Sequence, residues 1–450
     1  MGLEKIKNGF VLLSLRLARL CDSVAKIGGA STKHKQKLRI LFCFVFGLHY
    51  LCRVMRNGLK HKRLLMCTYY IIIMCALAHA QSYSYNTKFT ISKKNFVDSI
   101  PIEIEDDQIY LKATIHGMTY RFSLDTGSSQ GIVYSSSQFP YTRKLGTITS
   151  HDANGNTSKI EVVQYPDFQI GTLMIRGYTG SYIPSNVKRK DFDAVIGFDL
   201  FNKGLTAKID VQNKVMVITD NYKYFDFEPG YSTKYRLVRW VPNIKIGIYH
   251  YCIDEARFDT GSRRLYEMSS KSWKEFTAKF PDFETQVEGV SWGRRSIGTF
   301  GAERPGETAF LWLDELQWDF FTFHDYHTLT TQGNSRIGAQ ILNYGNIIIN
   351  PKRKELIFQP FDEGSHCYIS NTQTDIAFVP YNGHAMVGLI WEKSKQYESG
   401  LREGDVILSI DNTPILSFQH FLNYPFISSY KHQFKVRGSD GRIRIVESER

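Results

Sequence analysis

"FSLDTGSSQGIVY", residues 122–134, contains a tetrapeptide, DTGS at 125–128, that returns unchanged at 259–262. At ordinary residue frequencies one such tetrapeptide is expected only ~0.005 times in a chain of this length, so the second copy indicates an internal repeat. Each copy follows an alternating apolar pattern that predicts two strands joined by a tight turn. The patterns are "QIYLKATIHGMTYRFSL", with its turn at His116-Gly117, and "NIKIGIYHYCIDEARF", with a turn of its own.

A second repeated pattern follows each tetrapeptide. "VIGFDLFNKGLTAKID" (195–210) matches "RIGAQILNYGNIIIN" (336–350) with one residue fewer. Gly197 lies 72 residues after Asp125, and Gly338 lies 79 residues after Asp259. Two copies of about 130 residues each predict duplicated halves rather than a solenoid, which stacks at least three shorter repeats.

The paired DTGS loops, each followed by an apolar strand that ends in glycine, resemble the two-lobed pepsin fold assembled from retropepsin-like halves. The resemblance covers residues 97–361. It implies a mostly β aspartic protease fold with a cleft between the lobes and one aspartate from each lobe, Asp125 and Asp259, at its floor. We expect the N-terminal lobe over residues 81–230 and the C-terminal lobe over residues 231–361.

The last segment, residues 362–450, carries a different pattern. "YESGLREGDVILSIDNTPI" (397–415) resembles the core of a PDZ domain, a small α+β fold, through Gly400, Leu401, Gly404 and Asp405 and the apolar strand after them. The loop that binds a peptide carboxylate in PDZ domains is approached only by "MVGLIW" (386–391). A protease followed by a PDZ domain resembles a family of exported bacterial aspartic proteases, and implies a peptide ligand for this domain.

The N-terminal segment carries all of the excess charge. Residues 1–63 contain 14 Lys/Arg and 2 Asp/Glu, which accounts for the whole formal charge of +12. From residue 55 a basic stretch precedes the apolar run "LLMCTYYIIIMCALA" and an A-x-A exit at 78–80. This order is typical of a secretory signal peptide. We therefore expect a signal peptide over residues 55–80 and export to the periplasm, the cell envelope or the extracellular space.

Residues 1–54 hold a further apolar stretch, "ILFCFVFGLHYLC", flanked by arginines. Two alternatives remain for this leader: a translation start assigned too far upstream, or an uncleaved membrane anchor. We expect membrane contact only through the leader. The rest of the chain has equal numbers of acidic and basic residues. It therefore has no overall positive charge for binding the phosphate backbone of a nucleic acid, and we expect no nucleic-acid partner. Outside the leader only Cys252 and Cys367 remain, which permits one disulfide but no disulfide framework.

The repeated loops predict a specific chemistry. Two carboxylates that share one proton can activate water and protonate a leaving nitrogen without a covalent intermediate. The resemblance assigns these roles to Asp125 and Asp259, and we expect no cofactor and no metal. A peptide or protein is the expected substrate. The alternative is an inactive peptide-binding protein that keeps the same fold.

The residues around the two aspartates have implied roles as well. Thr126 and Thr260 hydrogen-bond each other's loops across the lobe interface, and Ser128 and Ser262 hydrogen-bond the outer carboxylate oxygens. Gly127 and Gly261 let the loops turn tightly. Gly197 and Gly338 each lie in the strand behind one of the loops. Because hydroxyl bonds favour a charged carboxylate, we expect the best activity below neutral pH. Arg336 stands where the resemblance expects an apolar residue.

A cleft protease also needs a flap that excludes water. "HDANGNTSKIEVV" (151–163) predicts a hairpin with Asn154-Gly155 as a two-residue turn, and "IGTFGAERPGETAFLWL" (297–313) occupies the matching place in the second half. The tyrosine that pepsin flaps use is missing. Because both aspartates precede residue 362, we expect removal of residues 362–450 to leave cleavage of short peptides largely intact.

Two other motifs suggest different chemistry. Residues 127–131 satisfy G-x-S-x-G, the nucleophile elbow of serine hydrolases, with Ser129 as the nucleophile. An elbow needs a helix after the serine, but "GIVYSSSQFPY" favours a strand and is closed by proline. His324 and His327 have a spacing seen in metal sites, yet Asp325 alone does not complete one, so a hydrogen-bonding role is the simpler interpretation.

Overall fold

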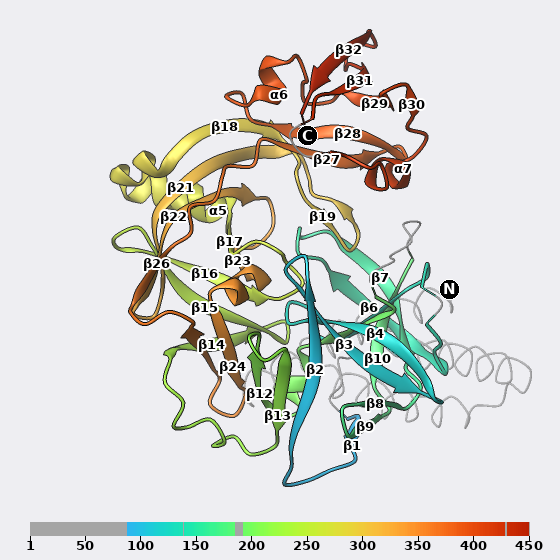
Figure 1. The fold of residues 1–450 in the computed structure, drawn as a ribbon, viewed down its shortest axis with the longest axis vertical. Coiled ribbons are helices and arrows are strands. Elements are labelled where there is room, and N and C mark those ends of the chain that lie inside the picture. The colour runs from blue at the N-terminus through green and yellow to red at the C-terminus, as the bar shows by residue number, and fades with distance from the viewer. Residues whose placement is uncertain (1–87, 138, 185–191, 428–429, 450) are drawn as a thin grey trace, which may run out of the picture. The chain divides into compact units, whose positions relative to one another are not determined.

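The computed structural model describes residues 88–137, 139–184, 192–427 and 430–449, all within one compact unit that begins at Ser82. Their fold is mostly β, with a closed arrangement of paired strands and a separate C-terminal sheet (Figure 1). No helix in these ranges is long and apolar enough to cross a membrane. The predicted leader and signal peptide lie outside the described residues.

The first half of the fold consists of short, mainly antiparallel strands. They are β1 (Thr90–Ile91), β2 (Val97–Glu105), β3 (Gln108–Ile115), β4 (Met118–Asp125), β5 (Gly131–Tyr134), β6 (Arg143–His151), β7 (Thr157–Gln164), β8 (Phe168–Ile170), β9 (Leu173–Arg176), β10 (Thr179–Ile183), β11 (Ala194–Gly197), β12 (Thr206–Asp210) and β13 (Val215–Thr219), with helix α4 (Asp199–Asn202) after β11. The predicted β3–β4 turn is present, with positive φ at His116 and Gly117, as a type I′ hairpin requires.

The second half repeats this order with longer strands. It contains β14 (Tyr231–Val238), β15 (Val241–Ile248), β16 (Cys252–Asp259), β17 (Tyr266–Ser269), α5 (Ser270–Lys279), η1 (Pro281–Gln286), β18 (Val287–Gly293), β19 (Ile297–Gly298), β20 (Gly301–Ala302), β21 (Gly306–Trp318), β22 (Phe321–Thr331), β23 (Arg336–Gly338), η2 (Ala339–Asn343), β24 (Gly345–Asn350), β25 (Glu355–Pro360) and β26 (His366–Tyr368). Strand β26, beyond the boundary expected at residue 361, pairs with β22. Cys252 and Cys367 are both free thiols.

The sequence repeat appears as a repeated strand arrangement. In the first half β4 runs parallel to β11, with Asp125 opposite Gly197, and β11 also pairs with β5. In the second half β16 runs parallel to β23, with Asp259 opposite Gly338, and β23 also pairs with β17. Each DTGS loop therefore connects two strands that flank a third strand ending in glycine.

One sheet joins the two halves. Its strand order is β2-β13-β12-β24-β25-β14, and the central pair β12–β24 aligns Ala207 with Ile349. Strand β24, "GNIIIN", is buried along its whole length, as expected for an apolar run covered on both faces. One large hydrophobic cluster extends through both halves. The shared sheet and core fix the two DTGS loops relative to each other.

The C-terminal region has a core of its own. Its elements are β27 (Ile376–Tyr381), β28 (His384–Ile390), α6 (Lys395–Glu398), β29 (Val406–Ile410), β30 (Thr413–Pro414), α7 (Phe418–Leu422), β31 (His432–Arg437) and β32 (Ile443–Ser448). Gly400 and Gly404 have positive φ, and Leu401 is fully buried in the core. Asp405 is buried against Arg444, 2.6 Å from its Nη2.

This region packs against the strands that lead to the tip of the second half. Trp391 stacks on Phe310 with 5.7 Å between ring centroids, and the backbone N–H of Arg294 donates to the Gly388 carbonyl at 2.6 Å. Ala302 packs against a small cluster formed by Val379, Met386 and Val406. The C-terminal region thus supports residues 294–302.

Candidate active site

The two DTGS loops meet where the halves join. Asp125 ends β4 and Asp259 ends β16. A Cβ atom at Gly127 would lie 2.2 Å from Cγ of Asp259, and one at Gly261 would lie 2.6 Å from Cγ of Asp125. Any larger residue would collide with the opposite carboxyl group. Glycine therefore lets each loop approach the aspartate of the other half.

Two buried threonines connect the loops across the interface. The Thr260 N–H donates to Thr126 Oγ1 at 2.9 Å, and the Thr126 N–H donates to Thr260 Oγ1 at 3.0 Å. Each hydroxyl then donates to the other half, Thr126 to the Phe258 carbonyl at 2.9 Å and Thr260 to the Leu124 carbonyl at 2.7 Å. The hydrogen bonds implied for this pair are present, and they hold the aspartates in a fixed relation.

Backbone N–H groups orient the carboxylates. Gly127 and Ser128 donate to Asp125 Oδ1 at 2.9 and 3.1 Å, and Gly261 donates to Asp259 Oδ1 at 3.1 Å. These three bonds fix one oxygen of each carboxyl group in its loop. The other oxygen stays available for the opposite aspartate or for a substrate.

The serine hydroxyls do not bond as expected. Ser128 Oγ donates to the Gln130 carbonyl at 2.7 Å, and Ser262 Oγ lies 3.5 Å from Glu267 Oε2. The prediction that both hydroxyls hold the outer carboxylate oxygens is therefore wrong. In each half the hydroxyl bonds an acceptor of its own half instead.

The aspartates behave as one electrostatic unit. Burial raises the pKa of Asp125 to about 8, and the neighbouring charge and hydrogen bond of Asp259 act in the same direction. The N–H groups of Gly127 and Ser128 favour the charged form but are outweighed. Because like charges this close oppose each other, the pair holds one proton at neutral pH.

The glycine strands lie directly behind the loops. A Cβ at Gly197 would lie 2.6 Å from backbone atoms of Gln130, and one at Gly338 would lie 2.3 Å from the Arg264 carbonyl oxygen. Both positions therefore require glycine for close backbone approach. This is the place that the resemblance implied for them.

Arg336, the unexpected charge in the second glycine strand, has a buried partner. Its Nε donates to Glu267 Oε2, while Arg295 Nη1 lies 2.6 Å and Arg264 Nε 3.5 Å from Glu267 Oε1. Burial alone would raise the pKa of Glu267, but the charges of the three arginines hold it well below its usual range. A buried ion cluster replaces the apolar contact that the resemblance suggested.

The first hairpin near the aspartates differs from its prediction. Strands β6 and β7 are joined by residues 152–156, and Asp152 Oδ1 accepts from the N–H groups of Asn154 and Asn156 at 3.0 and 2.8 Å. The prediction of a two-residue turn at Asn154-Gly155 is therefore wrong. The Asp152 carboxylate organises a wider loop, in which Gly155 has a φ of +78°.

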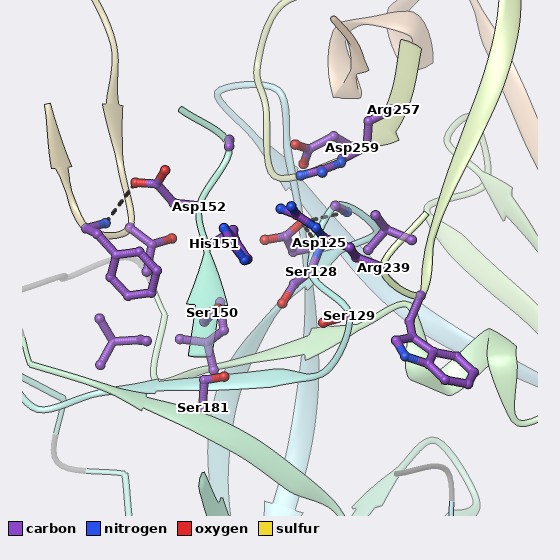
Figure 2. Close-up of a pocket in the computed structure, with 18 of the residues that line it drawn as sticks. Asp125, Ser128, Ser129, Ser150, His151, Asp152, Ser181, Arg239, Arg257 and Asp259 are labelled. Carbon is purple, nitrogen blue, oxygen red and sulfur yellow. Dashed lines mark hydrogen bonds between the residues drawn. The ribbon is translucent and has the colours of Figure 1, made fainter. Parts of the chain in front are cut away.

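A second tip meets this loop from the other half. The β19–β20 hairpin lies between β18 and β21, and its Phe300 N–H donates to Asp152 Oδ2 at 3.1 Å (Figure 2). Nearby, Ser296 Oγ donates to Asn154 Oδ1 at 2.7 Å. The two tips thus form a hydrogen-bonded cover, and they occupy the places where flaps were expected.

Two cavities are lined by both aspartates. The first, of about 330 Å³, is lined by Asp125, Asp259, Arg239 and Arg257 among others, and Figure 2 shows it. The second, of about 390 Å³, is lined by the same two aspartates together with the apolar ring of Phe192 and the Glu267 cluster. A chain that passes over the aspartates would fill both.

Arg239 and Arg257 are functional candidates that the sequence analysis missed. Arg257 lies two residues before Asp259, so the alternation of β16 places both side chains on one face. That signal was readable from the sequence. Arg239 lies in the β14–β15 turn with a φ of +52°, and no sequence pattern connects this turn with the aspartates.

The other motifs do not form competing sites among the described residues. Ser129 is followed by strand β5, and not by the helix that an elbow needs. His324 Nδ1 lies 3.0 Å from the Asp314 carbonyl, and His327 Nδ1 lies 2.9 Å from Glu288 Oε2. The two histidines therefore bond separate partners, as the simpler interpretation held.

A shallow groove lies in the C-terminal region between β27 and α7. It is lined by Asp375, Ile376, Phe378, Gln396, Phe421 and Leu422. Strand β27 is at the edge of its sheet. Within "MVGLIW" (386–391), whose sequence approaches the pattern of a carboxylate-binding loop, residues 386–390 belong to β28, which pairs with β27 and β29.

The contacts of the C-terminal region change the expectation for its removal. Deleting residues 362–450 would uncover Phe310 and Ala302, and burying a large apolar side chain is worth about 1.5–3 kcal/mol. We now expect the truncated protein to cleave short peptides more slowly and to unfold at lower temperature. Peptide turnover and thermal unfolding of the truncated and full chains test this. Leu422→Ala, which alters the groove without touching these contacts, should keep short-peptide turnover. Unchanged turnover in the truncated protein would restore the original expectation.

Comparison of the chain with models of protein families gives no match, and comparison with curated proteins gives none. The case for a function therefore stands on the residues and their geometry: two mutually facing aspartates on repeated loops, under a cover contributed by both halves.

Proposed function

We propose that this protein is an aspartic endopeptidase with a two-lobed, pepsin-like architecture built from retropepsin-like halves, in which Asp125 and Asp259 carry the reaction. The observation that supports the proposal most is the symmetric approach of each aspartate to the glycine of the opposite loop. A binding protein has no need to hold two carboxyl groups so close that one stays protonated.

The proposed chemistry uses the shared proton. The ionised carboxylate takes a proton from a water molecule, whose oxygen attacks the carbonyl carbon of the peptide bond. The protonated carboxyl group donates its proton toward the carbonyl oxygen. When the C–N bond breaks, the leaving nitrogen receives a proton from the pair. As the new carbonyl forms, a hydroxyl of the tetrahedral intermediate gives its proton back to the pair, so the singly protonated state returns.

The surrounding residues fit this role. The threonine hydrogen bonds hold the carboxyl groups in place before the substrate binds, so little reorganisation is needed during reaction. The cover formed by Asp152 and Phe300 lies over a cavity that reaches both aspartates, where a flap would exclude water. Closure by two hydrogen-bonded tips implies that the tips separate when substrate enters.

We further propose that the C-terminal region is a PDZ-like domain that holds a peptide of a substrate or partner along the edge of β27, next to α7. The signal-peptide pattern places the whole protein outside the cytoplasm in this proposal, in the periplasm or cell envelope, or attached there through an uncleaved N-terminal segment. The domain boundaries follow the predicted ones, with β26 added to the second lobe.

The proposal is tested by incubating the purified protein with an unstructured protein and identifying new termini by mass spectrometry. Internal cleavage that disappears in Asp259→Asn supports an endopeptidase. Binding of the unstructured protein without any cleavage, in wild type and variant alike, would support the inactive peptide-binding alternative instead.

The raised pKa of Asp125 sets a testable pH range. Below about 8 Asp125 keeps its proton, and above about 8 Asp125 ionises and the acid is lost. We therefore expect kcat/KM to stay high at pH 7 and to fall as pH rises through about 8. This limit is higher than the sequence suggested, because burial, together with the charge and hydrogen bond of Asp259, raises the pKa of Asp125.

Cleavage of an uncharged peptide between pH 4 and 10 measures this profile, with circular dichroism at each pH to verify that the protein stays folded. A decline already centred near pH 5 would contradict the expected effect of burial on this pair.

A further inference from the structure

We propose that Arg257 makes the first cavity select acidic side chains, so that preferred substrates carry Asp or Glu at one of the two positions beside the scissile bond. The inference rests on the proposed peptidase function and names its substrate class. Arg257 lies on β16 two residues before Asp259 and lines the cavity next to it. In Figure 2 its side chain extends toward the aspartates.

The Arg257 guanidinium has no partner in the part of the chain that the structure describes. The residue is only 9% exposed, it makes no side-chain hydrogen bond or ion pair there, and its Nε is buried without an acceptor. Burying a charge without a counter-ion is costly, and the usual solution is a paired carboxylate. Because Arg257 lines the first cavity, a carboxylate of a bound substrate could take the place of that counter-ion.

A neighbouring arginine shows the contrast. Arg336 lies directly opposite Arg257 in the β16–β23 register, and it is buried to a similar degree. Arg336, however, is neutralised by Glu267. The fold therefore gives Arg336 a carboxylate of its own, whereas the carboxylates that act on the charge of Arg257 are the two aspartates of the site, with which it makes no ion pair among the described residues.

The other charges around the first cavity add to its preference for an anion. Arg239 provides a second guanidinium, and the His151 imidazole lines the same cavity. The Asp152 carboxylate is occupied by backbone donors, including the Phe300 N–H. The catalytic pair contributes one negative charge, which it needs for the reaction. A substrate carboxylate could accept two parallel bonds from a guanidinium, whereas a lysine side chain would be repelled.

The test uses peptides that are identical except for Glu, Gln or Lys at each position beside the scissile bond. We expect wild type to cleave the Glu peptide about tenfold or more faster than the Gln peptide, in kcat/KM, at one of the two positions. Arg257→Met should bring this ratio close to one, and Arg257→Lys should restore part of it. Lys245→Met, which removes an exposed charge outside both cavities, should leave the ratio unchanged.

The outcomes separate the inference from the proposed function. A wild-type ratio near one, or a ratio that Arg257→Met leaves intact, overturns the inference while the peptidase function stands. If Arg257 only adjusts the ionisation of the aspartates, its replacement shifts the pH profile of both peptides alike and leaves the ratio intact, which also overturns it. If no peptide is cleaved, the function fails, and the inference is then decided by whether wild type binds the Glu peptide more tightly than the Gln peptide and Arg257→Met does not.

Discussion

Replacement of either Asp125 or Asp259 by Asn should lower peptide turnover by roughly 10²–10⁴-fold or more, the range expected when acid–base catalysis is removed. Asparagine keeps the shape of the side chain and can still accept from the loop N–H groups. It cannot take a proton from water or share one with its neighbour. Because the two groups act as a unit, the double variant should be little slower than either single variant.

Turnover of an unstructured protein by the three variants measures this effect, and thermal unfolding verifies that each is folded. Asp167→Asn is a matched control, since this exposed carboxylate forms only a surface pair with Arg176. It should cleave as wild type does. Full turnover in folded Asp259→Asn would exclude the aspartate pair as the catalytic groups. Inactivation by a serine-directed reagent at Ser129 would instead support the G-x-S-x-G motif as a nucleophile elbow.

The sequence was most informative where a residue is required by local geometry. The DTGS repeat and the two glycine strands could be found because glycine at 127, 261, 197 and 338 is imposed by approaches that leave no room for a Cβ atom. The turn at His116-Gly117 was likewise readable, since two-residue hairpins need positive φ. Such constraints act over a few residues and leave a clear pattern.

The wrong predictions concern side chains whose hydrogen-bond partners lie far away in the sequence, or for which several nearby acceptors compete. Nothing near Ser128 or Ser262 in the sequence indicates which acceptor its hydroxyl prefers. The loop after β6 looked like a two-residue turn because Asn154-Gly155 matches that pattern, whereas the Asp152 carboxylate accepts from Asn154 and Asn156 and also from Phe300, 148 residues away. The contacts of the C-terminal region with Phe310 are likewise tertiary, and nothing in the sequence indicated them.

Arg336 illustrates the same limit at the centre of the molecule. From the sequence it was only a charged residue at an apolar position. Its partner, Glu267, lies 69 residues away, and the pair becomes meaningful once both are buried together with Arg295. No periodicity relates the three residues, so only the folded chain shows that they neutralise one another.

Replacement of Glu267 by Gln should reduce the free energy of unfolding by about 3–5 kcal/mol, because it removes one member of a buried ion cluster and leaves charged partners uncompensated. Arg336 and Arg295 are both buried and both bond this carboxylate. Since the arginines lower the pKa of Glu267, it stays charged in the native state through the mildly acidic range. Its contribution is present above the ordinary glutamate pKa and is lost only as pH falls toward the lower native value.

Urea unfolding at pH 7 and pH 5 measures this loss, which should be similar at the two values. Glu255→Gln is the matched control: it breaks one ion pair with Arg236, in which the arginine is mostly exposed and the glutamate partly buried, and should cost less than about 1 kcal/mol. If Glu267→Gln is as stable as Glu255→Gln, the arginines must be solvated rather than paired. The glycine strand behind Asp259 would then be held by the shared sheet and core alone.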